Sequence, residues 1–169
     1  MREIAFEDIP TWVGQELAVT EWRTITQGQV DLFAQATGDH QWIHVDVERA
    51  KRESPFGAPV AHGFLTLSLL PMLLGESVRV KGAVMGINYG LNRVRFTAPV
   101  PVGRAVRGRV SIKSVERLEP ADTLTGGPGW QIVWTVMIEL EGSERPACVA
   151  EMVSRSLAAP ATASSQSAA

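Results

Sequence analysis

The second half of the chain alternates between hydrophobic and polar positions with the period of a β-strand. In residues 130–140, WQIVWTVMIEL, hydrophobic side chains occupy every second position, and a similar alternation runs through residues 105–115, AVRGRVSIKSV. A period of two is typical of strands with one buried and one solvated face. Residues 83–98 and 145–157 predict two more strands, and residues 16–23 a fifth. We therefore expect about five antiparallel strands.

The first half predicts helices with recognisable ends. Thr26 precedes Gln29 by three positions, which is a capping-box pattern, and apolar residues then recur at helical spacing as far as Gly38. Glycine is a common left-handed stop, so the first helix should end there. Asp46 stands before VERAKRE as the N-cap of a second short helix that ends before Pro55.

Residues 62–75 differ because they are apolar on every face of a helix. Such a helix is expected to be buried, with a length of about 20 Å and a kink or tightened turn at Pro71. A sheet that covers it must curve around it. The predicted fold class is α+β, with a curved antiparallel sheet wrapped around a long buried central helix. We expect one domain over residues 1–157 and a disordered tail over 158–169.

Composition narrows the possible functions. The chain has 169 residues, of which 45% are hydrophobic and 20% are charged, as in an ordinary globular domain. A net charge of −2 argues against nucleic acid as a partner. The single cysteine, Cys148, excludes a disulfide framework and a thiolate-built metal site. We expect no signal peptide and no membrane insertion, because the apolar run 64–74 is too short to span a bilayer. The expected location is the cytoplasm.

Two polar segments carry the candidate chemistry. In residues 38–46, GDHQWIHVD, Asp39 and His44 form either an acid–base pair or part of a polar loop, and the spacing alone leaves both open. In residues 56–64, FGAPVAHGF, Gly63 opens the apolar helix, where free backbone N–H groups suit a carbonyl oxygen that gains negative charge. The alternative is that His62 and Gly63 only make a tight helix start. Asp46 is interpreted as a cap and His40 as a bystander.

Together these segments resemble the signatures of the MaoC-like dehydratases, also called (R)-specific enoyl-CoA hydratases, which have the hotdog fold. The resemblance covers roughly residues 10–157 and is strongest to the subgroup of nodulation protein N. The family's Gly-Asp, four residues, then His corresponds to Gly38-Asp39 and His44, and its Ala-His-Gly to residues 61–63. The chain departs from the common Asn-Pro between aspartate and histidine, where it has Gln41-Trp42.

The resemblance implies a hydro-lyase. Asp39 and His44 would activate a water that adds to C3 of a trans-2-enoyl thioester, and Gly63 N–H would stabilise the thioester oxygen. The implied partners are acyl-CoA or acyl carrier protein thioesters and a second copy of the chain in a homodimer, with no metal and no other cofactor. The predicted substrate-binding residues are Gln41, Trp42, Phe56, His62 and Phe64. For the aromatic residues, a place in the core or an interface is the alternative.

Two rival functions stay open on the sequence. One is a hotdog thioesterase, because a fold does not decide a function. The other is a non-catalytic acyl-thioester or lipid-binding module.

Overall fold

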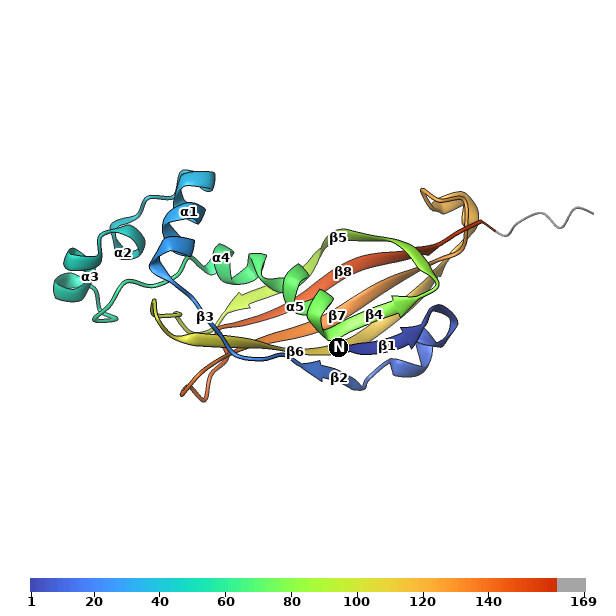
Figure 1. Ribbon diagram of the computed structural model, residues 1–169, viewed down its shortest axis with the longest axis horizontal. Helices are drawn as coiled ribbons and strands as arrows, with labels where there is room; N and C mark the ends of the chain where they lie inside the picture. Colours follow the sequence, from blue (N-terminus) through green and yellow to red (C-terminus); the bar gives the residue numbers. More distant parts are fainter. Residues whose placement is uncertain (161–169) are drawn as a thin grey trace, which may run out of the picture.

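The computed structural model describes residues 1–160, which form a long antiparallel sheet with helices at one end and along one face (Figure 1). The main sheet has the order β2-β6-β7-β8-β5, and β3 pairs with β6 beside β2. Its strands are β2 (Glu16–Val19), β3 (Arg23–Thr24), β5 (Ala83–Phe96), β6 (Ala105–Leu118), β7 (Gly129–Leu140) and β8 (Cys148–Ala158). The five predicted strand segments are confirmed, with the segment at residues 16–23 divided into β2 and β3.

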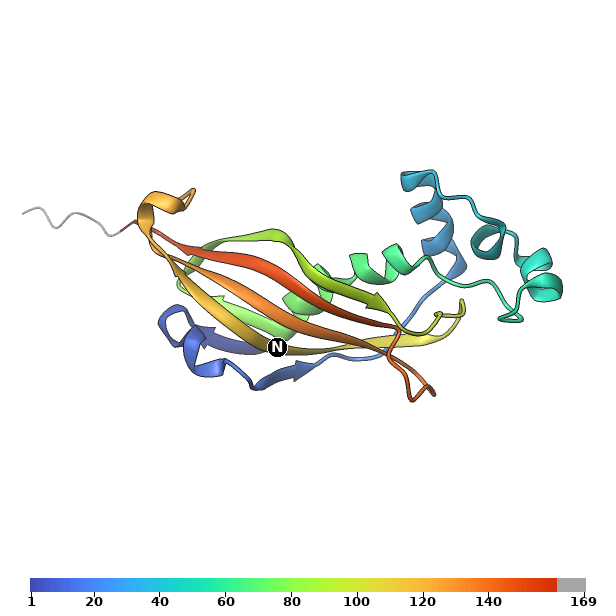
Figure 2. The same cartoon turned by 180° about the vertical axis from the view of Figure 1, so that it is seen from behind.

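The alternation of burial follows the alternation of sequence. In β7 every second residue from Ile132 to Leu140 is buried, and the residues between them are partly exposed. The buried row faces the helices and the other row faces solvent. Figure 2 shows this second face of the sheet without a helix over it. On it, Glu139 lies 2.6 Å from Arg107 and 3.2 Å from Arg109, so cross-strand ion pairs occupy the solvated positions.

Three helices precede the central segment and lie beyond the end of the sheet (Figure 1). They are α1 (Gln27–Thr37), α2 (Trp42–Val45) and α3 (Val47–Glu53). The capping box of Thr26 and Gln29 is present, and Gly38 adopts the left-handed conformation with φ 79°. The Asp46 side chain accepts a hydrogen bond from the Arg49 N–H at 3.0 Å, which confirms its role as a cap. No local pattern in the sequence predicted α2.

The central apolar segment is helical, but the expectation of one long helix buried on all sides needs correction. It consists of α4 (Gly63–Ser68) and α5 (Leu70–Ser77), which meet at Leu69. Pro71 lies in the first turn of α5, where its missing N–H costs no helical bond, so the proline starts a new helix. Leu70 and Leu73 are buried, whereas Phe64 and Met72 are exposed. The apolar composition therefore reflects one face against the sheet and one open face.

Two features near the N-terminus were not expected. Strand β1 (Arg2–Ala5) pairs in parallel with β4 (Val78–Lys81) as a separate two-stranded sheet, and the 3-10 helix η1 (Phe6–Trp12) follows it. A second 3-10 helix, η2 (Pro120–Asp122), lies between β6 and β7.

The predicted domain limit at residue 157 stays a prediction. Ala158 is the last residue of β8, and residues 161–169 of the predicted tail lie outside the described residues.

The core lies between α5 and the inner face of the sheet. Leu73 is fully buried there, as are Val110, Val136 and Ile138 from the middle strands. A Cβ added at Gly108 would lie 3.1 Å from Leu73, so α5 rests on nearly bare backbone of β6. This close approach fixes the helix on the sheet.

Replacement of Leu73 by alanine should lower the free energy of unfolding by about 2–5 kcal/mol, because it leaves a cavity between α5 and β6. The matched control is Leu32→Ala, which makes the same change in α1 at a side chain that is 66% exposed. The control should change stability by no more than about 0.5 kcal/mol. Chemical denaturation followed by circular dichroism measures both, and equal losses would contradict this account of the core.

Candidate active site

The segment before α4 is held between α2 and a loop of the sheet. The Val60 N–H donates to the Ile43 carbonyl at 3.0 Å, and the Ala61 N–H donates to the Val100 carbonyl at 2.8 Å. Both hydrogen bonds join main-chain atoms, so they set the backbone position without depending on side-chain identity. This places the Val60 carbonyl beside α2 and directs residues 62 and 63 to the same region.

His44 is the best-defined polar side chain of the region. It is buried near the end of α2, and its Nδ1 lies 2.6 Å from the Val60 carbonyl oxygen. Because a carbonyl only accepts, Nδ1 carries the proton and Nε2 offers a lone pair. The Gln27 amide donates to the His44 carbonyl at 2.8 Å and thereby ties α1 to α2. The neutral ring of His44 is thus oriented as a proton acceptor.

Burial lowers the pKa of His44 below its ordinary value of 6.5. The Val60 carbonyl acts in the opposite direction, because it accepts from the ring and favours the charged form. The positive charge of a protonated His62 adds to the lowering, and the Asp39 carboxylate opposes it. Since burial dominates, His44 is neutral at neutral pH, as a general base must be.

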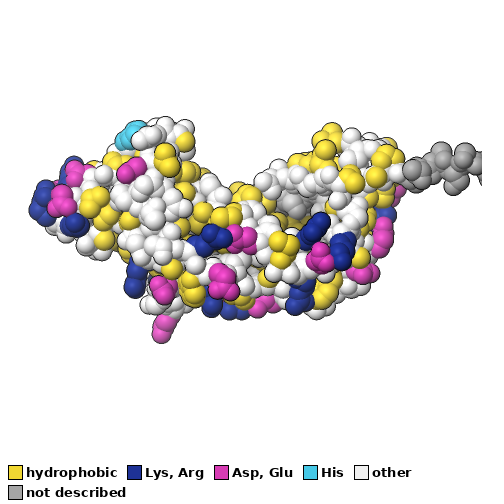
Figure 3. Space-filling model, in the orientation of Figure 1, with side chains coloured by type: hydrophobic (Ala, Val, Ile, Leu, Met, Phe, Trp, Pro, Cys, Tyr) yellow, Lys and Arg dark blue, Asp and Glu magenta, His cyan; other side chains and the backbone are white. Residues whose placement is uncertain are grey.

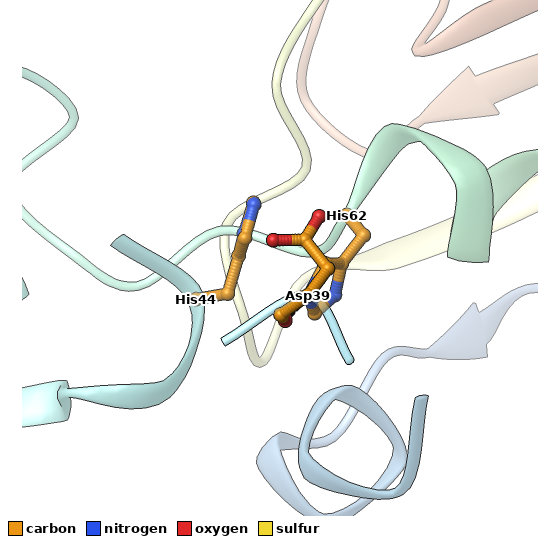
Figure 4. A group of neighbouring side chains, drawn as sticks. All are labelled: Asp39, His44 and His62. Carbon is orange, nitrogen blue, oxygen red and sulfur yellow. Dashed lines mark hydrogen bonds between the residues drawn. The ribbon is translucent and has the colours of Figure 1, made fainter. Parts of the chain in front are cut away.

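Asp39, His44 and His62 come together, as Figure 4 shows. The imidazole rings of His44 and His62 are stacked, with centroids 3.9 Å apart and planes 29° apart. His62 Nε2 donates to the backbone carbonyl of Asp39 at 2.9 Å, across 23 residues of sequence. One polar atom from each of the three side chains lies within 4.8 Å of the others. Asp39 itself is exposed to solvent.

The same three residues offer ligand atoms of the kinds that bind metals, so the arrangement has to be compared with a metal centre. Metal–nitrogen bonds are about 2.0–2.1 Å long, and their lone pairs must converge on one point. Two stacked rings with centroids 3.9 Å apart present their nitrogen atoms side by side, so their lone pairs do not converge on one point. We therefore do not assign a metal here.

Gly63 begins α4 directly after His62, and its N–H is one of the free donors of the helix start. A Cβ at this position would lie 2.9 Å from the Phe96 ring, so only glycine fits without displacement of Phe96. A cavity of about 310 Å³ adjoins Gly63. Its walls include Ile43, Phe56, Val60, Thr66, Phe96 and Val100. Phe96 was not among the predicted site residues, because nothing in the sequence places β5 against the start of α4.

The remaining predicted site residues, Gln41, Trp42 and Phe64, lie outside the cluster of Asp39, His44 and His62. Gln41 is exposed, and its backbone N–H donates to Asp39 Oδ1 at 3.4 Å. The Trp42 ring packs under the Arg49 guanidinium, with the central guanidinium carbon 4.3 Å from the ring centroid. Phe64 is 67% exposed and meets Phe96 edge-on with centroids 5.7 Å apart. The substrate-binding role of these three residues stays a prediction.

Neither Asp39 nor His44 lines the cavity beside Gly63 or the other hollows described within residues 1–160. A groove of about 310 Å³ lies between the two central helices and β5, and its lining includes Leu67, Ser68, Pro71, Tyr89, Leu91 and Met152. A larger hollow, of about 410 Å³, lies on the solvated side around Trp22, Arg107 and Glu139. The cavity beside Gly63 is also lined by Val60 and Ala61, which directly precede His62 in the chain.

Residues 8–125 match the family described as MaoC like domain. The chain belongs to this family. It is 50% identical over 151 residues to 3-hydroxyacyl-thioester dehydratase Z of Mycobacterium tuberculosis, which covers 89% of this chain and 95% of that protein. It is 44% identical over 154 residues to nodulation protein N of Rhizobium leguminosarum, covering 90% of this chain and 91% of the relative.

The solved structures agree with the MaoC-like assignment. The (R)-hydratase of A. caviae superimposes with a TM-score of 0.65 at 27% identity, over 84% of this chain and 94% of that one. The hotdog fold and the likeness to nodulation protein N expected from the sequence are thus confirmed. Within residues 1–160 of this MaoC-like protein, no helix has the length and apolarity needed to cross a membrane.

Nuclear magnetic resonance should reveal opposite tautomers for the two stacked histidines. At neutral pH, long-range 15N–1H spectra of the imidazoles should show the proton on Nδ1 of His44 and on Nε2 of His62, because each donates to a backbone carbonyl from that atom. The chain has three histidines, so the exposed His40 provides the reference. The reverse tautomer on His44 would place a proton on its free nitrogen and contradict the site geometry.

Proposed function

We propose that this protein is an (R)-specific enoyl-thioester hydratase and dehydratase, with Asp39 and His44 as the water-activating pair. The observation that supports it most is the orientation of His44. Its Nδ1 is bound to the Val60 carbonyl, so its Nε2 lone pair is free, and Asp39 provides a carboxylate within reach of the same point. A neutral imidazole beside a carboxylate is a pair that can hold and deprotonate one water.

In the proposed hydration, one water donates its hydrogen atoms to His44 Nε2 and to the Asp39 carboxylate. The water oxygen bonds to C3 of the trans-2-enoyl thioester while a proton passes from the water to the pair. The electron pair of the C2=C3 bond moves toward the thioester carbonyl, and C2 then takes a proton back. The product is the (R)-3-hydroxyacyl thioester, so the sum is one water added across the double bond. Dehydration is the reverse.

Gly63 is proposed to stabilise the negative charge that develops on the thioester oxygen. Its backbone N–H is a free donor at the start of α4. The apolar cavity of about 310 Å³ beside it offers a place for part of the thioester, with Phe56 on its wall. Gln41, Trp42 and Phe64 are proposed to contact outer parts of the substrate.

The substrate is proposed to be an acyl-CoA or acyl carrier protein thioester. Relatives carry names that support the acyl-thioester class, such as 3-hydroxyacyl-thioester dehydratase Z. The exposed Arg93 and Arg95 of β5 would suit the anionic end of such a carrier. A cytoplasmic location is proposed, where reducing conditions keep Cys148 as a thiol. Its burial raises the pKa of that thiol to about 11.

A thioesterase is the rival enzyme function, and one assay distinguishes the two. Crotonyl-CoA is mixed with the protein, and loss of enoyl absorbance is followed in parallel with release of free thiol. Hydration removes the enoyl absorbance and releases no thiol. Thiol release would favour a thioesterase, and the absence of both signals over short and long acyl chains would favour a non-catalytic binding module.

Asp39→Asn and His44→Ala should each reduce kcat/KM for crotonyl-CoA by at least about a hundredfold, because each removes one half of the acid–base pair. The control is His40→Ala, which removes an exposed imidazole from the same loop and should leave the rate within about twofold of the wild type. Near-normal rates in both Asp39 and His44 variants would overturn the assignment of the pair.

A homodimer is proposed because β5 has one free edge within the described sheet. In the order β2-β6-β7-β8-β5, this strand of 14 residues pairs with β8 alone. Large hydrophobic side chains are exposed along it and on the neighbouring helices: Val84, Met85, Tyr89, Leu91 and Phe96 on β5, and Phe64 and Met72 on α4 and α5. An unpaired edge with apolar neighbours is a surface that a second copy can cover. In the space-filling view, hydrophobic side chains extend along the face that carries these helices (Figure 3).

Leu91→Arg should shift the protein toward a monomer, because it places a charge in the middle of this edge. The control is Leu124→Arg, at a side chain that is 82% exposed in the loop after η2. Analytical ultracentrifugation over a range of concentrations should show a dimer for the wild type and the control. An unchanged dimer in Leu91→Arg would place the interface elsewhere.

A further inference from the structure

His62 is too deeply buried to act as the substrate-binding residue that the sequence suggests. Its side chain is only 2% exposed, and it lies between two aromatic rings. Phe33 of α1 is on one side, with ring centroids 5.1 Å apart, and His44 is on the other at 3.9 Å. The contacts of the His62 side chain are therefore with Phe33, His44 and the Asp39 backbone.

We propose that His62 is a positioning residue that holds Asp39 in place and adds to the burial that opposes protonation of His44. This inference rests on the proposed function of Asp39 and His44. His62 reaches both members of the pair at once. Its Nε2 donates to the Asp39 backbone carbonyl at 2.9 Å, and its ring lies on the His44 ring.

The first part of this role is mechanical. Asp39 follows the left-handed Gly38 in an exposed stretch between α1 and α2, so its position depends on few contacts. The Asp39 N–H lies 3.4 Å from the Thr37 hydroxyl, which is a long hydrogen bond. The His62 donor is the shorter contact and comes from a buried ring 23 residues away. It therefore ties the Asp39 backbone to the start of α4.

The second part is electrostatic. Two imidazoles in face-to-face contact resist simultaneous protonation, because like charges at this separation repel strongly when buried. The charged groups that act on His44 are His62, which lowers its pKa, and the Asp39 carboxylate, which raises it. From α1 the Gln27 amide donates both to the His44 carbonyl and to the Asp31 carboxylate, each at 2.8 Å, and the Val60 carbonyl accepts from the His44 ring. His62 is thus the partner whose charge opposes protonation of His44.

The unpartnered nitrogen of His62 supports a functional reason for this residue. Nδ1 of His62 is buried and has no hydrogen-bond partner within residues 1–160. An unpaired buried polar atom costs about 1–3 kcal/mol, so a phenylalanine would pack here with less penalty. The cost of keeping an imidazole at this position is therefore balanced by what the ring does for Asp39 and His44.

The test uses two variants and a matched control. His62→Phe keeps a flat ring against His44 but removes the charge and the donor, whereas His62→Gln keeps a donor and removes the ring. His40→Gln removes an exposed imidazole from the same loop. The pKa of His44 is measured by 15N–1H titration of the imidazoles, and kcat/KM for crotonyl-CoA is measured over the same pH range.

In the wild type, the pKa of His44 should lie below 6.5. Both His62 variants should raise the pKa of His44 by roughly 0.5 unit or more, because the opposing charge is gone. A higher pKa means that the base becomes protonated at higher pH, so the acid limb of kcat/KM moves upward. His62→Phe should also lower the rate at its optimum by at least about tenfold, while its stability is no lower than that of the wild type.

A pKa of His44 at or above 6.5 in the wild type would overturn the proposal without any variant. So would an unchanged pKa of His44 in a folded His62 variant, or an unchanged acid limb with an equal loss of rate at every pH. These results leave the proposed function standing if Asp39→Asn and His44→Ala are still inactive. Conversely, active Asp39 and His44 variants would contradict the proposed function. The pKa of His44 in the His62 variants would still show whether His62 opposes protonation of His44.

Discussion

The close packing of Leu73 on the bare backbone at Gly108 determines where the candidate site lies. With no side chain on Gly108, α5 approaches β6 closely enough that an added Cβ would be 3.1 Å from Leu73. Because α4 precedes α5 with only Leu69 between them, the fixed helix directs the start of α4 toward the end of the sheet. The helices α1 to α3 lie beyond that end (Figure 1). Gly63, His62 and the polar loop meet at this point.

Main-chain atoms determine the geometry of the site. His44 and His62 each donate their single N–H to a backbone carbonyl, that of Val60 and that of Asp39. The Val60 carbonyl is itself positioned by the main-chain hydrogen bonds of residues 60 and 61. Because carbonyls cannot change protonation state, they fix the tautomer of each ring over the whole pH range in which the imidazoles are neutral.

The sequence predicted the elements whose causes are local. Period-two alternation identified β6 and β7, and the capping box and Gly38 identified α1. The division of the central helix was harder, since an apolar residue exposed on an open helix face has the same identity as a buried one. Phe64 and Leu73 illustrate this, with one 67% exposed and the other fully buried. The parallel pairing of β1 with β4 depends on a contact between distant segments and left no local pattern.

The same distinction applies to the site. The family signature paired Asp39 with His44, whereas the spacing of the two residues alone left their pairing open. It did not indicate that His62 stacks on His44 at 3.9 Å, because that contact requires residues 60 and 61 to pass between α2 and the sheet. Nor did it indicate Phe96, which comes from β5 to limit the space at Gly63.

The cluster of Asp39, His44 and His62 and the apolar groove beside Ser68 come from different parts of the chain. Asp39, His44, His62 and Gly63 all come from one contiguous stretch outside the sheet, whereas the groove beside Ser68 and Tyr89 is lined by the central helices, β5 and β8. Amino-acid changes along the groove therefore leave the hydrogen bonds of the cluster intact. The shape of the groove can therefore change by substitution while the hydrogen bonds of Asp39, His44 and His62 are kept.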